Sequence, residues 1–202
     1  MSVWAIVPVK PFNSAKSRLA PALAPAERQG FSRGLLEHTL DVLAQARGVD
    51  RVLVVSRDSG PLTLARSRGA HTVTESGAPE LNNALNRASR AAVALGARAV
   101  LILPIDLPLL CPADVERVLS LNGADRTVVI APDRHGSGTN ALVVRPPLMF
   151  AYAFGPDSYR QHHERAVAAG ARVETCNLPG IALDVDDPDD LALYRSMSLQ
   201  RT

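Results

Sequence analysis

The chain has 202 residues, of which 47% are apolar and 21% are charged, and its formal net charge at neutral pH is +2. These values predict one soluble globular domain over residues 1–202, and they exclude a disordered or fibrous chain. The small net charge and the longest apolar stretch, residues 99–105, predict a protein that binds neither nucleic acid nor a membrane.

Strand-like and helix-like patterns alternate along the chain. In chain order they predict a strand over 3–9, a helix over 25–46, a strand over 51–56, a helix over 61–68, a strand over 71–74, a helix over 81–95, a strand over 99–105, a helix beginning at Pro112, strands over 127–131 and 140–144, a helix over 157–169, strands over 172–175 and 181–185, and a final helix over 188–194. This alternation, with strands that are apolar on both faces, predicts a mostly parallel sheet covered by helices on both sides. Ligands bind beyond the carboxyl ends of such strands, so we expect functional residues directly after them.

The cysteines and the first residues indicate the compartment. Cys111 and Cys176 are isolated and fit no metal-binding or redox spacing. The first residues run directly into a strand-like stretch without the basic leader of a signal peptide. Both observations favour a cytoplasmic protein with reduced thiols.

The loop after the first strand, VPVKPFNSAKSRLA, is basic. It contains Lys10, Lys16 and Arg18, and its two lysines are the only lysines among the 22 basic residues of the chain. Residues 8–19 contain no glycine, which excludes a dinucleotide-binding fingerprint and a P-loop. We favour triphosphate binding by this loop over the alternative, a solvated turn that is basic by chance.

The segment GAPELNNALNRA, residues 77–88, places polar side chains at the start of a predicted helix. Guanine presents N–H donors, which the carboxylate of Glu80 or the amide oxygens of Asn82 and Asn83 could accept. Helix capping is the alternative role, and we expect it for at least one of these three residues.

Asp106 lies at the end of the most apolar strand, within LILPIDLPLL. Pro104 and Pro108 stiffen the chain around it, at the edge of the sheet where a ligand would bind. A carboxylate in that place suits Mg²⁺, and we favour this over a capping or turn role.

Two glycine-containing segments could bind anions. In APDRHGSGTNALVV, residues 131–144, two glycines come before Thr139, and they indicate either a backbone anion site or a hairpin-like turn. In FGPDSYRQHH, residues 154–163, Gly155 comes shortly before Ser158 at a predicted helix start. The free N–H groups there could bind an anion, or Asp157 or Ser158 could simply cap the helix.

The segment LDVDDPDDL, residues 183–191, is strongly acidic. Residues 187–190 have an ordinary explanation as the N-cap and the first turn of a helix. Asp184 and Asp186 remain, and on a strand their side chains would point to the same face, where the two charges repel unless a cation lies between them. With Asp106 they could hold one or two Mg²⁺ ions.

Together, VPVKPFNSAKSRLA, LPIDLPLL, APDRHGSGTNAL, FGPDSYRQH and LDVDDPDDL resemble the guanylyltransferase family of coenzyme F-420 biosynthesis, the 2-phospho-L-lactate and phosphoenolpyruvate guanylyltransferases. The likeness extends from Val3 to Leu191. The first loop alone resembles a broader group of nucleotidyltransferases related to the molybdenum-cofactor guanylyltransferases, which carry Gly-Gly where this chain has residues 7–10. The resemblance implies a three-layer α/β/α nucleotidyltransferase fold with a mostly parallel central sheet.

The resemblance also implies roles for individual residues. The metal ligands, for Mg²⁺, would be Asp106, Asp184 and Asp186. The phosphorylated acid would contact Thr139, Gly155 and Ser158. GTP would be held by Val7, Pro8, Val9, Lys10, Lys16, Glu80 and Asn83. Lys16 and Arg18 would be catalytic, because positive charge stabilises the leaving pyrophosphate.

The expected reaction transfers GMP from GTP to the phosphate of phosphoenolpyruvate or 2-phospho-L-lactate, and the product would pass to the next enzyme of the F-420 pathway. We favour phosphoenolpyruvate, since the composition rich in Arg and Ala looks bacterial. The alternatives are another acceptor (3-phosphoglycerate, molybdenum cofactor or a sugar phosphate) and a non-catalytic nucleotide-binding regulatory module. The sequence leaves open whether the protein is a monomer or a homo-oligomer.

Overall fold

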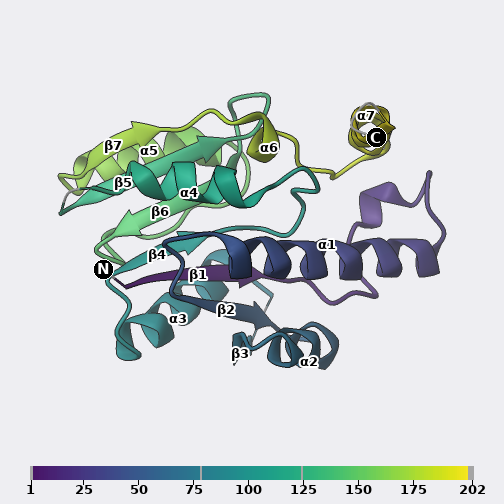
Figure 1. Cartoon of the computed structure of the whole chain (residues 1–202), viewed down its shortest axis with the longest axis horizontal. Coiled ribbons are helices and arrows are strands. Elements are labelled where there is room, and N and C mark those ends of the chain that lie inside the picture. Colours follow the sequence, from purple (N-terminus) through teal and green to yellow (C-terminus); the bar gives the residue numbers. More distant parts are fainter. Residues whose placement is uncertain (1, 78, 124, 200–202) are drawn as a thin grey trace.

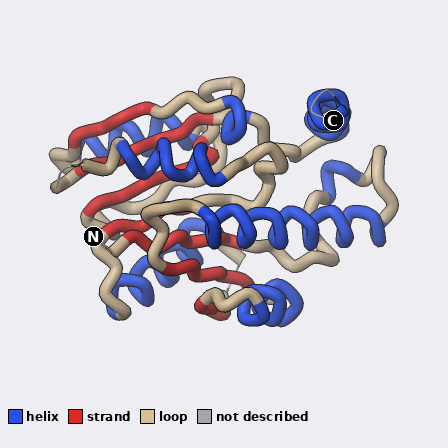
Figure 2. Tube along the Cα trace, viewed as in Figure 1, coloured by secondary structure: helices blue, strands red, loops and turns tan. Residues whose placement is uncertain are grey.

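The computed structural model describes residues 2–77, 79–123 and 125–199, which form a seven-stranded sheet between two layers of helices (Figures 1 and 2). The strands are β1 (Val3–Pro8), β2 (Arg51–Ser56), β3 (His71–Thr74), β4 (Ala99–Ile102), β5 (Thr127–Pro132), β6 (Thr139–Arg145) and β7 (Arg172–Thr175). The helices are α1 (Pro25–Gln45), α2 (Ser59–Ser67), α3 (Leu81–Ala94), α4 (Pro112–Ser120), α5 (Ser158–Ala168), α6 (Pro179–Ala182), α7 (Pro188–Leu199) and the short 3₁₀ helix η1 (Ser17–Leu19). Within these ranges, none of the helices combines the length and the apolar character that crossing a bilayer requires.

The sheet is mostly parallel, as the sequence predicts. Its strand order is β3-β2-β1-β4-β6-β5-β7, and β6 runs antiparallel to both of its neighbours, while the remaining pairs are parallel. The carboxyl ends of β1 and β4 therefore lie beside the amino end of β6. Segments that follow β1 and β4 and segments that come before β6 meet at this one edge.

Alternating side chains of the strands build two cores, one on each face of the sheet. In β1, Ala5 and Val7 face the layer of α1, α2, α4 and α6, whereas Trp4 and Ile6 face the layer of α3 and α5. All four of these side chains are buried, so the strand is apolar at every position. This arrangement confirms the predicted three-layer α/β/α architecture.

A third and smaller core joins the region after β1 to the C-terminal segment. Leu19 of η1 is buried together with Val185, which comes before α7, and with Leu191 in α7. Phe31 and Tyr194 pack against these three side chains. In Figure 1 the loop after β1 and the segment that leads into α7 both lie at the side toward which the arrow of β1 points. Burial of this cluster therefore holds the basic loop and the acidic segment at the same edge of the sheet.

The predicted strand over 181–185 is wrong. Pro179 occupies the first turn of α6, which ends at Ala182, and the residues after it have no regular structure. Proline at that position favours a helix start because its missing N–H would be unpaired there in any case. One backbone hydrogen bond, from the N–H of Val185 to the carbonyl of Asp106 (2.9 Å), still ties the segment to the end of β4.

Several other boundaries differ from the prediction, most of them by one residue, and the final helix extends to Leu199 instead of residue 194. Two of the larger differences have a clear cause. β4 ends at Ile102, before the predicted end at residue 105, because Pro104 has no N–H with which to continue a ladder. α2 begins at Ser59 instead of residue 61, since the side chain of Asp58 caps it by accepting a hydrogen bond from the N–H of Gly60 (3.1 Å).

Candidate active site

Three acidic side chains and one lysine converge at the carboxyl edge of the sheet. The Nζ atom of Lys16 lies 3.2 Å from Oδ2 of Asp106 and 3.0 Å from Oδ1 of Asp186. Asp184 is close enough to both carboxylates for their charges to affect its pKa. The sequence predicts that Asp106, Asp184 and Asp186 meet, and the structure brings them together with Lys16, which is predicted to bind nucleotide.

The position of Lys16 is set by its backbone and by its neighbours. Its φ of 54° and ψ of 39° lie in the left-handed region, which a residue other than glycine occupies at a cost of about 1 kcal/mol or more. Leu19, fully buried, anchors the η1 helix that follows. The side chain of Lys16 is 8% exposed, so its ammonium group is held between the two carboxylates instead of extending into solvent.

The pKa shifts show a site with an excess of negative charge. Burial by itself would lower the pKa of Lys16, but the charges and hydrogen bonds of Asp106 and Asp186 outweigh it and raise that pKa. The pKa of Asp184 is raised by its burial and by the negative charge of Asp106, although a hydrogen bond from Asn140 acts in the opposite direction. The charges of neighbouring aspartates thus raise the pKa of both groups, as expected where carboxylates outnumber cations.

The donor set fits Mg²⁺, a hard cation that prefers carboxylate oxygens. Asp106 and Asp186 already share one cation, the ammonium group of Lys16. Within the described ranges, no group of three or more His, Cys, Asp or Glu side chains is placed so that it could hold a metal ion as it stands. The side chains would therefore have to shift, and Lys16 would have to release at least one carboxylate, for Mg²⁺ to bind.

Asp187 and Asp190 fix the backbone of the acidic segment. Oδ1 of Asp187 accepts hydrogen bonds from the N–H groups of Asp189 and Asp190, each 3.0 Å long, which confirms the predicted N-cap. Oδ2 of Asp190 accepts in turn from the N–H groups of Asp186 (2.9 Å) and Asp187 (3.1 Å), and its Oδ1 pairs with Arg134 (2.6 Å). Sequence analysis gave Arg134 no role, because the pairing joins segments more than fifty residues apart.

A β-bulge reverses the faces toward which the first two residues of β6 point. The ladder between β5 and β6 shifts by one residue at Ala131 and Pro132. Such a bulge re-aims the side chains beside it. Thr139 faces α5, where its hydroxyl group bonds to His162 (3.0 Å), and Asn140 faces α6, where its amide donates to a backbone carbonyl (2.8 Å).

Asn140 also holds one of the acidic side chains. Its Nδ2 donates to Oδ1 of Asp184 (3.3 Å) as well as to the carbonyl of Ile181 (2.8 Å). Asn140 is 6% exposed, so the amide is a buried partner that orients the carboxylate. In the sequence, the feature that could have identified Asn140 is its polar side chain at the start of a strand that is otherwise apolar.

The loop before α5 is held in an unusual backbone conformation. Gly155 has a φ of 136° and Asp157 a φ of 57°. The side-chain amide of Asn82 makes two hydrogen bonds to the backbone of Phe154. Its oxygen accepts from the N–H of Phe154 (2.8 Å), and its nitrogen donates to the carbonyl of Phe154 (3.1 Å). Ser158 is buried at the start of α5. These contacts hold the loop in one conformation, and the loop carries Gly155 and Ser158, which are predicted to contact the phosphorylated acid.

The capping alternatives have separate outcomes. Glu80 caps α3, since its carboxylate accepts from the N–H groups of Asn82 (2.9 Å) and Asn83 (2.6 Å). Asp157 makes no side-chain cap and instead pairs with Arg160 (2.6 Å). The contacts of Glu80 and Asn83 with guanine remain predictions.

The glycine-containing segment 131–144 is a β-hairpin, which was one of its two predicted structures. Asp133 organises the connecting loop, accepting hydrogen bonds from the N–H (2.9 Å) and the hydroxyl group (3.3 Å) of Ser137. The N–H of Tyr159 in α5 donates to the carbonyl of Ser137 (3.0 Å). The hairpin loop and the segment before α5, both predicted to bind the acid, are thus joined directly.

The remaining basic residues of the first loop lie apart from the acidic cluster. Lys10 and Arg18 have exposed side chains, and in the part of the chain that the structure describes no hydrogen bond or ion pair joins them to the cluster. Val7 and Val9 are buried at the end of β1, with Pro8 half-buried between them. These three residues form the end of β1 from which the loop begins. Their contacts with GTP remain predictions.

His162 is a buried residue to which sequence analysis gave no role. Its adjacent partner in the sequence, His163, is exposed, and two neighbouring histidines on a helix cannot form a metal pair. Burial, together with the charge of Arg165, lowers the pKa of His162 from its ordinary value of 6.5 to about 4. Ser158, His162 and Ala166 follow at intervals of four and form the buried face of α5. That helical period was the signal that could have identified His162.

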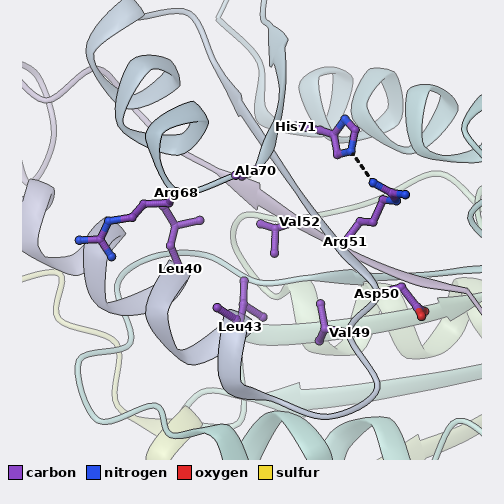
Figure 3. Close-up of a pocket in the computed structure, with 11 residues that line it drawn as sticks. Leu40, Leu43, Val49, Asp50, Arg51, Val52, Arg68, Ala70 and His71 are labelled. Atoms are coloured by element: carbon purple, nitrogen blue, oxygen red, sulfur yellow. Dashed lines mark hydrogen bonds between the residues drawn. The ribbon is translucent and has the colours of Figure 1, made fainter.

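A separate cavity of about 260 Å³ lies at the opposite edge of the sheet, at the amino ends of β2 and β3 (Figure 3). Leu43 and Val52 contribute apolar surface to it. Arg51 and His71 point toward one another and share a hydrogen bond of 3.3 Å. None of the predicted site residues lines this cavity.

Known proteins resemble the chain in sequence and in structure. The family described as "Guanylyl transferase CofC like" matches residues 3–194. The phosphoenolpyruvate guanylyltransferase of Rubrobacter xylanophilus is 45% identical, over 95% of this chain and 93% of its own. The 2-phospho-L-lactate guanylyltransferase of Methanothermobacter thermautotrophicus is 40% identical, over 95% of this chain and 83% of its own. A solved nucleotidyl transferase from the same genus has a TM-score of 0.71 at 19% identity, covers 100% of this chain and 99% of its own, and shows the predicted nucleotidyltransferase fold.

The buried His162 predicts an acid-sensitive contribution to stability. As the pH falls from 6.5 to about 4, the unfolded chain takes up a proton that the folded chain does not, so this residue lowers the free energy of unfolding by about 3 kcal/mol. We expect His162→Gln to remove that part of the decline in urea unfolding measured between pH 7 and pH 4. His163→Gln, at the exposed neighbour, should leave the decline unchanged, and equal slopes for both variants would contradict the assignment.

Proposed function

The chain belongs to the CofC-like guanylyltransferase family, and on that premise we propose that it transfers GMP from GTP to the phosphate of a phosphorylated three-carbon acid. The observation that carries the proposal is the convergence of Lys16 with Asp106, Asp184 and Asp186 beyond the carboxyl ends of β1 and β4. Three carboxylates and a lysine form a site for a cation and a polyphosphate together. Phosphoenolpyruvate is the favoured acid, since the relative from Rubrobacter that is 45% identical carries that name.

The reaction needs no general base. A phosphate monoester is largely dianionic at neutral pH, because its second pKa is about 6, so its oxygen can attack without losing a proton. That oxygen forms a bond to the α-phosphorus of GTP while the bond from this phosphorus to the bridging oxygen of the β-phosphate breaks. Pyrophosphate leaves with that electron pair. The lack of a predicted His or Glu base is therefore consistent with the chemistry.

The difficulty of the reaction is the mutual repulsion of two polyanions. Asp106, Asp184 and Asp186 are proposed to hold Mg²⁺, which when bound neutralises phosphate charge and brings the two substrates together. Asn140 orients Asp184, and Asp190 holds the backbone N–H of Asp186. These two contacts reduce the freedom of the carboxylates before any ligand arrives.

Lys16 and Arg18 are proposed to stabilise charge on the leaving pyrophosphate. Lys16 already lies within the acidic cluster, and Arg18 follows it in the η1 helix with an exposed side chain. The flexible stem of a lysine allows its ammonium group to exchange a carboxylate for a phosphate. Release of Lys16 by Asp106 or Asp186 would thus supply a cation to GTP as the carboxylates take up the metal.

The proposed substrate contacts divide between two regions of the edge. The acid would be bound by Thr139, Gly155 and Ser158, around the joined hairpin loop and α5. GTP would be bound by Val7, Pro8, Val9, Lys10, Lys16, Glu80 and Asn83. The product would pass to the next enzyme of coenzyme F-420 biosynthesis. We also propose a cytoplasmic location, whose reducing conditions suit the unpaired Cys111 and Cys176.

A substrate panel tests the proposed function. Purified protein would be incubated with Mg²⁺, with GTP or ATP, and with phosphoenolpyruvate, 2-phospho-L-lactate or 3-phosphoglycerate, and products identified by mass spectrometry. We expect a GMP adduct of phosphoenolpyruvate together with one pyrophosphate per turnover. A different adduct would assign another acceptor, and release of no pyrophosphate with any pair would contradict the enzymatic proposal.

Asp184→Asn tests the role of the acidic cluster. Loss of this charge should reduce kcat by at least about 10²–10³-fold, because a preorganised charged group is removed from the site, while the folded structure is retained. Asp187→Asn is the matched control, since asparagine caps helices as well as aspartate does. Rates from pyrophosphate release and folding from circular dichroism would be compared, and near-normal turnover of Asp184→Asn would remove the metal assignment.

Lys16→Ala tests the nucleotide role of the first loop. We expect GTP affinity to fall by roughly 10–100-fold, the amount typical of a lost hydrogen bond to a charged group. Isothermal titration calorimetry with GTP and Mg²⁺ measures it. Arg90→Ala on the exposed face of α3 serves as the control for loss of one positive charge. If Lys16→Ala bound GTP like the wild type, the loop would not bind the triphosphate.

A further inference from the structure

A buried chain of hydrogen bonds runs from the backbone before α5 to the first residue of β6. The N–H of Ala153 lies 3.0 Å from Nε2 of His162, and Nδ1 of the same ring lies 3.0 Å from Oγ1 of Thr139. His162 is fully buried and Thr139 is 5% exposed. Three separate segments of the chain therefore meet on one imidazole ring.

The direction of these hydrogen bonds follows from the chemistry of the groups. A backbone N–H can only donate, so Nε2 of His162 must accept the hydrogen bond from Ala153 and carries no hydrogen. A neutral imidazole then carries its hydrogen on Nδ1, which donates to the hydroxyl oxygen of Thr139. The neutral form is the one expected here, because burial and Arg165 lower the pKa of His162 to about 4.

The hydroxyl hydrogen of Thr139 is consequently left to point elsewhere. Among the residues that the structure describes, His162 is the hydrogen-bond partner of this hydroxyl group. Nδ1 of His162 is the donor in that bond, so the hydroxyl hydrogen does not take part in it. A buried hydroxyl hydrogen without an acceptor costs free energy, and a ligand oxygen would relieve that cost. Ser158 lies one turn before His162 on the same buried face of α5, so the hydroxyl group faces the side of the sheet that carries the proposed acid-binding residues.

Aromatic packing, together with the two hydrogen bonds, fixes the orientation of the imidazole ring. Phe154 packs against it edge to face, with 4.7 Å between ring centroids, and Phe150 lies 6.3 Å away. Asn82 clamps the backbone of Phe154 from the opposite side. The donor direction at Thr139 is thus determined by packing as well as by hydrogen bonding.

We propose that His162 is a positioning residue that fixes Thr139 as a hydrogen-bond donor to an anionic oxygen of the phosphorylated acid. The role rests on the proposed function and deepens it, because it states which hydrogen bond Thr139 offers to the acid. An oriented donor favours an oxygen acceptor at one place and disfavours a group that can only donate, such as an ammonium group.

Kinetics of four variants test the role. His162→Phe keeps an aromatic ring but loses both hydrogen bonds, and Thr139→Val keeps the side-chain shape but loses the hydroxyl group. Each should raise the KM for phosphoenolpyruvate about tenfold or more, with the KM for GTP changed less than twofold. Thr139→Ser should restore most of the affinity. His163→Phe, the same change at the exposed neighbour, should match the wild type.

Two further measurements separate a positioning role from a merely structural one. The double variant of His162→Phe and Thr139→Val should be no worse than Thr139→Val alone, since His162 acts through that hydroxyl group. In the wild-type protein, ¹⁵N NMR of the imidazole should show the hydrogen on Nδ1, and this measurement does not depend on a variant that folds.

The outcomes distinguish the two proposals. A hydrogen on Nε2, additive effects in the double variant, or an equal rise of both KM values would overturn the positioning role while GMP transfer by the wild type stood. Absence of GMP transfer by the wild type to every acid of the panel would overturn the proposed function, and the positioning role with it.

Discussion

Carboxylates that lie together at one edge of a sheet repel each other, and the contacts around Asp106, Asp184 and Asp186 counteract that repulsion. Lys16 supplies a positive charge between two of them, and Asn140 donates to the third. The small core around Leu19 and Val185 keeps the basic loop and the acidic segment together through apolar burial, which does not depend on charge. The site therefore has hydrophobic support beside an electrostatic arrangement that favours another cation.

The antiparallel strand β6 gives this edge its second set of functional groups. Because β6 begins where β1 and β4 end, its first residues lie beside the acidic cluster. The bulge sets which face each residue takes, so that Asn140 contacts Asp184 from the α6 side and Thr139 contacts His162 on the α5 side. Parallel strands alone would place only loop residues at this edge, whereas β6 contributes side chains that a sheet holds rigidly.

The sequence predicts the architecture, because it follows from the alternation of apolar strands and helices. The convergence of the aspartates is predicted from the ends of strands and from the family resemblance, although the strand expected to align Asp184 with Asp186 is absent. Prediction from sequence fails where a side chain pairs with a distant segment. Asp186 and Asp106 share Lys16 although the predicted strand over 181–185 is wrong, and a backbone hydrogen bond at Val185 ties the two segments together. Arg134 pairs with a residue of another element, and no local pattern describes such a pair. The helical period of α5 indicates that His162 is buried, but its bond to Thr139 follows from no local pattern.

The ion pair between Lys16 and Asp186 joins positions 170 residues apart. A chain emerging from the ribosome therefore completes β1, its basic loop and β4 long before the acidic segment exists to meet them. Contacts of such high sequence separation close a large loop, which costs conformational entropy. A chain that ended before residue 184 would accordingly retain Asp106 but not Asp186 as a partner of Lys16.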